Sequence, residues 1–194
     1  MLKELIDTFE ELKKYVFVID RGSMGRIIIK FNNNNFYHLV GFHKTNINMF
    51  IPDKIKSMDK KYKYIKKNIN KFDNILKNQI VEKDLLELRI KTFPKIIDLL
   101  NGNNTSLFNL KQKIPGSMYN GDYGLLKIYE YDINCLLGLK CENSYKSDLK
   151  CAPQSWMASN RFNRLVEGKR AIYLNTIFKI PIELYNEESD LIIA

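Results

Sequence analysis

Apolar side chains recur at helical spacing in two parts of the chain. Near the N-terminus they predict an amphipathic helix over about residues 2–14, and in the middle a longer helix over about residues 54–78. The first apolar face consists of Leu2, Leu5, Ile6, Phe9 and Leu12, and the second of Ile55, Met58, Tyr62, Ile65, Ile69, Phe72 and Leu76. A shorter helix is predicted over about residues 82–91, and Thr92 is predicted to cap another that starts at Pro94 and ends near Leu100.

Runs rich in β-branched and aromatic residues lie on both sides of these helices. Residues 15–19 and 26–31 flank turn-forming residues and predict a β-hairpin, after which the run Asn32 to Asn35 is interpreted as a turn. Further strands are predicted over about residues 106–110, 125–131, 134–141 and 170–180. In the last of these, alternation puts Thr176 on an apolar face, where core packing is expected, and Lys179 on the opposite face.

This order of elements predicts one domain of the α+β class over residues 1–194. We expect a small antiparallel β-sheet with an N-terminal helix and a central helical insertion over about residues 54–101. Hydrophobic residues make up 45% of the chain, which is enough for a packed core and excludes a disordered protein.

The chain is strongly basic, with 31 Lys and Arg against 22 Asp and Glu and a formal net charge of +9. This excess favours a polyanionic partner, nucleic acid first and an anionic membrane second. On the predicted 54–78 helix, Lys60, Lys63 and Lys67 are candidates for contact with a nucleic-acid backbone, or they only solvate a surface helix. The same two interpretations apply to a basic cluster before the last predicted strand, formed by Arg161, Arg164 and Arg170.

The three cysteines, Cys135, Cys141 and Cys151, show no CxxC spacing and lie far along the chain from its two histidines. A zinc site is therefore not expected, and free thiols in a reducing compartment are the simplest interpretation. The N-terminus begins an acidic amphipathic helix rather than a signal peptide, and no apolar run approaches the length of a membrane span. These features predict a soluble cytoplasmic protein with no membrane partner.

Both histidines lie within one nonapeptide, Phe36 to Lys44. Imidazole exchanges protons near neutral pH, so this segment is a candidate acid/base site, but its apolar residues equally suit a structural, partly buried histidine. Five residues place two side chains on opposite faces of a strand and about 140° apart on a helix. We therefore expect one of them, His43, to act with a partner from the late strands, and His38 to be structural.

Three segments carry a resemblance to a known family. They are Phe36-Tyr37-His38-Leu39-Val40-Gly41-Phe42-His43-Lys44, then Pro153 with Ser155 and Trp156, and finally Thr176-Ile177-Phe178-Lys179. Over about residues 15–179 the chain resembles the fourth subgroup of the PBECR nucleases of phages and mobile elements, which groups barnase, EndoU, colicin E5/D and RelE-like nucleases. The resemblance implies a BECR-like fold and a metal-independent endoribonuclease of the toxin or effector type, with RNA as target and no cofactor.

The same resemblance suggests the site residues. The candidate catalytic residues are His43, His38, Lys44, Ser155, Lys179 and Thr176. In such an enzyme one group takes the proton of the ribose 2′-OH, another protonates the leaving 5′-oxygen, and cations and hydroxyls bind the phosphate. Lys44 and Lys179 suit phosphate binding, whereas Ser155 either holds a phosphate oxygen or caps a turn. Trp156 either stacks on a base or fills the core.

A second function remains open for the same fold. The chain is then a non-catalytic, anti-CRISPR-like anti-defence protein that binds nucleic acid, a host protein or a nucleoprotein complex through its basic surface. For the nuclease, a cognate inhibitor is a further expected partner. The two functions differ in whether activity depends on the histidines or on the lysines.

Overall fold

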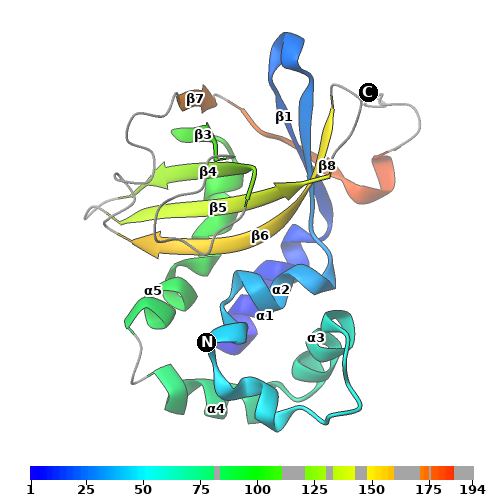
Figure 1. Ribbon diagram of the computed structural model, residues 1–194, viewed down its shortest axis with the longest axis vertical. Coiled ribbons are helices and arrows are strands. Elements are labelled where there is room, and N and C mark those ends of the chain that lie inside the picture. Colours follow the sequence, from blue (N-terminus) through cyan, green and yellow to red (C-terminus); the bar gives the residue numbers. More distant parts are fainter. Residues whose placement is uncertain are drawn as a thin grey trace.

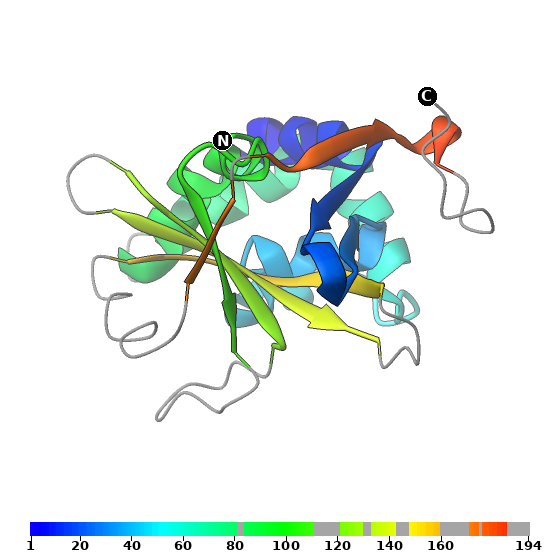
Figure 2. The ribbon, with the colours of Figure 1, turned by 90° about the horizontal axis from the view of Figure 1, so that it is seen from above.

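The computed structural model describes residues 1–80, 84–110, 121–129, 133–142, 148–159, 171–174 and 176–185. In these ranges a single sheet of eight strands has helices packed against one face (Figure 1). The sheet is curled, so β1 and β8 turn away from β4 and β5 (Figure 2). The predicted α+β class is confirmed.

The N-terminal elements follow the sequence pattern closely. Helix α1 (Leu2–Leu12) buries its predicted apolar face. Strands β1 (Tyr15–Asp20) and β2 (Arg26–Lys30) form the predicted antiparallel hairpin, with a short 3-10 helix, η1 (Gly22–Met24), at its tip. The hairpin buries Phe17, Ile19, Ile27 and Ile29 on the face toward the helices.

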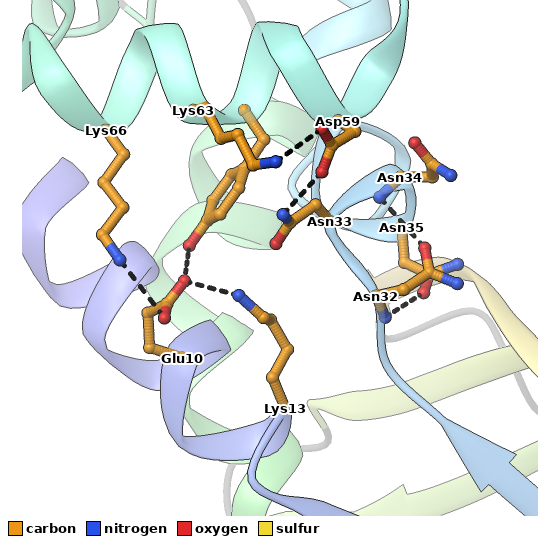
Figure 3. Close-up of polar contacts among 10 residues, drawn as sticks. Glu10, Lys13, Asn32, Asn33, Asn34, Asn35, Asp59, Lys63 and Lys66 are labelled. Carbon is orange, nitrogen blue, oxygen red and sulfur yellow. Dashed lines mark hydrogen bonds and ion pairs between the residues drawn. The ribbon is translucent and has the colours of Figure 1, made fainter.

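The asparagine run starts a helix, so its interpretation as a turn alone is wrong. In α2 (Asn33–Leu39), the side chain of Asn32 accepts a hydrogen bond from the backbone N–H of Asn34 at 3.0 Å. The Asn35 side chain in turn accepts one from the backbone N–H of Asn32 at 2.8 Å (Figure 3). These reciprocal bonds satisfy N–H groups that the first helical turn leaves without partners.

The predicted helix over residues 54–78 is two helices. Helix α3 (Met58–Lys67) starts after Ser57, whose hydroxyl caps it, and α4 (Ile69–Ile80) follows a break at Asn68. At the break, the Asn68 side chain donates a hydrogen bond to the carbonyl of Tyr64 at 2.8 Å, an alternative to the regular helical ladder. The apolar face survives the break, since Tyr62, Ile65, Phe72 and Leu76 are all buried.

Helix α5 (Asp84–Thr92) runs into a 3-10 turn, η4 (Phe93–Lys95), and then into α6 (Ile96–Leu100). Pro94 lies in the first turn of η4, as predicted. Thr92 is the N-cap residue of η4, as predicted, but its hydroxyl makes no capping hydrogen bond and instead donates backward to the carbonyl of Leu88 at 2.7 Å.

The remaining strands are β3 (Thr105–Asn109), β4 (Tyr123–Ile128), β5 (Asn134–Cys141), β6 (Leu149–Ser159), β7 (Ala171–Leu174) and β8 (Phe178–Pro181). The strand order is β7-β3-β4-β5-β6-β2-β1-β8. Pairs between these described strands are antiparallel except β2 with β6, which run parallel. The sheet is thus larger than predicted and not wholly antiparallel.

Two strand predictions need correction. The single strand predicted over residues 170–180 is divided into β7, which pairs with β3 at one edge, and β8, which pairs with β1 at the other. Strand β6, the longest of the sheet, was not predicted, and it places Ser155 and Trp156 inside the sheet rather than in a turn.

The main core lies between the helices and the inner face of the sheet. On the outer face, Phe108, Leu110, Leu126 and Leu136 form one smaller cluster, and Val16, Val18, Ile28 and Ile180 form another. Cys141 and Cys151 face each other across β5 and β6 and form a disulfide, so the expectation of free thiols is wrong for this pair. Cys135 is free and buried. No helix in the described ranges is both long and apolar enough to cross a membrane.

Candidate functional site

The two histidine rings lie side by side at the surface. His38 is in the last turn of α2, and His43 is in a 3-10 turn, η2 (Phe42–Lys44). Their ring centroids are 5.1 Å apart and the rings are inclined at 41°. Both residues are exposed. The two rings lie together, although the five-residue spacing of a regular helix or strand would direct them to different sides.

Gly41 causes this convergence. It adopts φ +84°, a left-handed conformation that costs other residues energy but not glycine. Helix α2 therefore ends, the chain reverses, and the next turn brings His43 back beside His38.

Buried apolar side chains hold the chain reversal at Gly41 in place. Phe36, Tyr37, Leu39, Val40 and Phe42 are all fully buried. The ring of Phe42 packs edge-on against Phe36 and Tyr37, with centroids 5.7 and 5.8 Å away. The apolar residues of the nonapeptide thus have a structural role, because they anchor the turn in the core, while the two histidines remain exposed to solvent.

Arg89 on α5 lies against the same turn and was not identified from the sequence. Its side chain is only 8% exposed, and Nη1 donates a hydrogen bond to the backbone carbonyl of His38 at 3.4 Å. Burial lowers the pKa of Arg89 to about 10. One sequence signal exists: Arg89 has the helical spacing of the buried residues Leu86, Ile90 and Phe93, so it occupies a position where an apolar residue is expected.

Trp156 holds α5 in place. Its indole Nε1 donates a hydrogen bond to the hydroxyl of Thr92 at 3.2 Å, and its ring packs edge-on against Phe93. Trp156 is fully buried, which excludes the interpretation that it stacks on a base. The indole therefore ties β6 to the helix that carries Arg89.

The other candidates from the late strands lie elsewhere. Ser155 pairs with Gly138 and Trp156 with Leu137, so the alternation of the strand places Ser155 on the sheet face opposite the helices. Lys179 lies at the edge strand β8, where its Nζ is 3.7 Å from a carboxylate oxygen of Glu11 and 3.7 Å from the centroid of the Tyr15 ring.

Thr176 lies between β7 and β8 beside Gly102, and it is exposed rather than part of the core, because the predicted strand is interrupted there. Lys44 is the last residue of η2, directly after His43. Arg161, Arg164 and Arg170 lie outside the residues that the structure describes.

The lysines of α3 differ in their surroundings. Lys63 pairs with Asp59 at 2.9 Å and Lys66 with Glu10 at 3.2 Å (Figure 3). Lys60 and Lys67 share an exposed face with Lys63, whose side chain remains 66% exposed despite its ion pair. Such a face can meet a polyanion, although part of its charge already has a partner.

Glu10 joins α1 to α3. Its carboxylate accepts hydrogen bonds from Lys13 and from the hydroxyl of Tyr62, and it pairs with Lys66 (Figure 3). Burial alone would raise the pKa of Glu10, but the hydrogen bonds from Lys13, Tyr62 and Lys66 outweigh it and lower the pKa to about 2. This cluster is satisfied within the chain, so it stabilises the helical layer.

The described residues contain no group of three or more His, Cys, Asp or Glu side chains placed to hold a metal ion. Compared with protein-family models, with curated proteins and with solved structures, the chain matches none. The site is therefore defined by its own geometry: two exposed imidazoles on a turn with buried apolar side chains, and a buried guanidinium against that turn.

Proposed function

We propose that the chain is a metal-independent endoribonuclease in which His38 and His43 act together on one phosphodiester. The observation that carries this proposal is the ring separation of 5.1 Å between two exposed imidazoles. A turn with fully buried apolar residues holds both rings, so little reorganisation is needed when a substrate binds.

The chemistry requires one neutral and one protonated imidazole, a combination that neutral pH allows for this side chain. The neutral ring accepts the proton of a ribose 2′-OH, and the 2′-oxygen bonds to the adjacent phosphorus. The bond from phosphorus to the 5′-oxygen breaks, and the protonated ring gives its proton to that oxygen. The products are a 2′,3′-cyclic phosphate and a 5′-hydroxyl end.

Two features of the sequence support this proposal. The net charge of +9 favours a polyanionic substrate. The resemblance of residues 36–44 to PBECR nucleases points to RNA and to a toxin or effector of a phage or mobile element acting in the cytoplasm. The proposal rests on the histidine pair and does not require Ser155, Thr176 or Lys179.

The test is cleavage of total RNA by the purified protein in EDTA, with the new ends analysed for 2′,3′-cyclic phosphate. We expect His38→Ala and His43→Ala each to slow cleavage by about 10²- to 10⁴-fold, the usual contribution of an acid or base. Asn34→Ala, an exposed position on the same helix, serves as the control. Cleavage that survives in the double histidine variant, or that EDTA abolishes in the unchanged protein, excludes the proposed mechanism.

The exposed lysine face of α3 supports a second candidate function, a non-catalytic anti-defence protein that binds RNA, a host protein or a nucleoprotein complex. Triple charge reversal at Lys60, Lys63 and Lys67 should then abolish binding, while the same reversal at Lys3, Lys77 and Lys91 should have a much smaller effect. Binding through phosphates weakens steeply between low and physiological salt. The nuclease, in contrast, should lose activity with the histidines and tolerate the triple change.

A further inference from the structure

Arg89 is a cation in a position that favours an apolar side chain. It lies on the face of α5 that also carries Leu86, Ile90 and Phe93, and only 8% of it is exposed. Removing a charge from water destabilises a fold unless a partner compensates for it, and an apolar residue of similar volume is often at least as stable. A guanidinium here therefore needs partners that compensate for the burial of its charge.

The described residues provide little compensation for this charge. A guanidinium has five N–H donors, and within the described residues Arg89 uses one of them, for the carbonyl of His38 at 3.4 Å. Arg26 shows the contrast, because its Nε and Nη2 both donate to the carboxylate of Asp148, at 2.9 and 2.6 Å. Glu87, on the same helix as Arg89, pairs with Lys91 instead.

The turn between the histidines leaves space for this side chain. A Cβ atom at Gly41 would lie 3.0 Å from both Cδ and Nη1 of Arg89 and 3.1 Å from Cδ1 of Leu86. Glycine at this position thus serves two purposes, since it permits the positive φ of the turn and the close approach of the guanidinium. As a result, Arg89 contacts the backbone that joins the two imidazoles.

We propose that Arg89 is the anion-binding residue of the histidine site and takes a phosphate oxyanion as its missing partner. A planar guanidinium suits phosphate oxygens because it can donate two parallel hydrogen bonds, and its charge acts strongly where water is largely excluded. The guanidinium contacts the backbone between His38 and His43, so phosphate bound to it lies at the turn that carries both histidines. This inference deepens the proposed nuclease function, whose substrate is an RNA phosphodiester, but it does not depend on turnover.

The experiment compares the unchanged protein with Arg89→Gln, Arg89→Lys and Lys91→Gln. The last variant removes one exposed charge two residues further along α5 and controls for net charge. Inorganic phosphate is titrated in, and the ring resonances of both histidines report binding. We expect Arg89→Gln to weaken phosphate binding by at least about tenfold, Arg89→Lys to weaken it less, and Lys91→Gln to leave it nearly unchanged.

Stability separates anion binding from a structural role. If Arg89 serves the ligand, Arg89→Gln unfolds at the same or a higher urea concentration than the unchanged protein without phosphate, and it loses the stabilisation that phosphate provides. If Arg89 only supports the turn, Arg89→Gln is less stable but its folded fraction binds phosphate as before, and the inference is wrong. If Arg89→Gln fails to fold, Arg89→Lys, which keeps the charge, takes its place. Weaker phosphate binding at unchanged stability then supports the anion site, and unchanged phosphate binding at lower stability overturns it.

The two proposals fail in distinguishable ways. Phosphate binding that depends on Arg89, in a protein that cleaves no RNA, supports the anion site and overturns the nuclease. RNA cleavage that depends on the histidines and persists in Arg89→Gln, with phosphate affinity unchanged, overturns the anion site alone. Titration with a short single-stranded DNA, which has the phosphodiester but lacks the 2′-OH, shows whether the site accepts diesters as well as free phosphate.

Discussion

Trp156 on β6 and Thr92 on α5 are joined by a buried hydrogen bond of 3.2 Å from the indole Nε1 to the hydroxyl. The Thr92 hydroxyl in turn donates a hydrogen bond to the carbonyl of Leu88. The indole of β6 is thereby connected, through the hydroxyl, to the backbone of α5. Arg89 follows Leu88 directly. Trp156 therefore connects β6 to the helix that carries Arg89. Pro153 of the same strand contacts α2 directly, since its carbonyl accepts a hydrogen bond from the Asn35 side chain at 3.0 Å.

This relationship predicts energetic coupling between Trp156 and Thr92. Trp156→Phe removes the donor and leaves a small cavity, and Thr92→Val removes the acceptor while keeping the shape, so each should destabilise the fold by about 1–3 kcal/mol. Because both changes delete the same hydrogen bond, the double variant should be about 1 kcal/mol more stable than the sum of the single effects predicts. Urea denaturation measures all three values, and strict additivity would contradict the coupling.

Gly41→Ala should destabilise the fold more than Gly22→Ala. Both glycines have positive φ, +84° and +61°, so each substitution strains the backbone by about 1 kcal/mol. Nothing lies within 4 Å of a Cβ at Gly22, whereas one at Gly41 meets Arg89 at 3.0 Å, which should add about 1–2 kcal/mol. Thermal or urea unfolding tests the difference. Equal decreases in stability for both variants would show that the Arg89 side chain moves away from the new Cβ at no cost.

Glu10 predicts a stability change in acid. Its pKa in the folded protein, about 2, is below the ordinary value of 4.5, so its contribution is fully present above about pH 4.5 and is lost as the pH falls toward 2. Glu10→Gln should therefore lower the free energy of unfolding at pH 7. The loss should be only about 1 kcal/mol, because the Glu10 side chain is a third exposed and solvent screens its interactions. The variant should also show a smaller fall in stability between pH 4.5 and 2 than the unchanged protein. Urea unfolding across this range, with Glu4→Gln on the exposed side of α1 as control, measures the effect; parallel pH profiles for both variants would reject it.

The cysteines predict a definite pattern of thiol reactivity. Burial raises the pKa of Cys135 to about 11, so the folded protein should react very slowly with iodoacetamide at pH 8. Denaturation without reductant should expose one thiol, and denaturation with reductant three, counted by mass spectrometry. Reduction of the Cys141–Cys151 bond should lower stability by up to about 3 kcal/mol. Three thiols in unreduced, denatured protein would show that the disulfide is not formed.

The sequence predicted the elements whose pattern is local. Helix α1, the hairpin and β5 each show a clear periodicity over their own length, and the structure places them within two residues of the expected ends. Strand β6 was missed because Pro153 and the small and polar residues around it obscure the alternation, and because β6 pairs with a strand far away in the sequence. The break at Asn68 was not predicted, because the apolar face of α3 continues into α4 without a change in spacing.

The candidate site shows the same division between local and distant information. The nonapeptide identified both histidines, but helical or strand spacing cannot show that Gly41 reverses the chain and brings them together. Arg89 is 51 residues from His38 in the sequence, and nothing local relates the two. Pairing of Cys141 with Cys151 likewise requires the register of β5 and β6, which depends on finding β6 first.

The parallel pairing of β2 with β6 determines when the free edge of β2 can be covered during synthesis. Arg26 and Asp148, which hydrogen-bond where this pairing begins, are 122 residues apart. The hairpin can form as soon as residues 15–30 leave the ribosome, but the edge of β2 then has no partner until residues 149–159 have also emerged. An unpaired strand edge is a site for wrong association. Nascent chains that stop before β6 should therefore depend on chaperones, and release from them should coincide with the synthesis of β6.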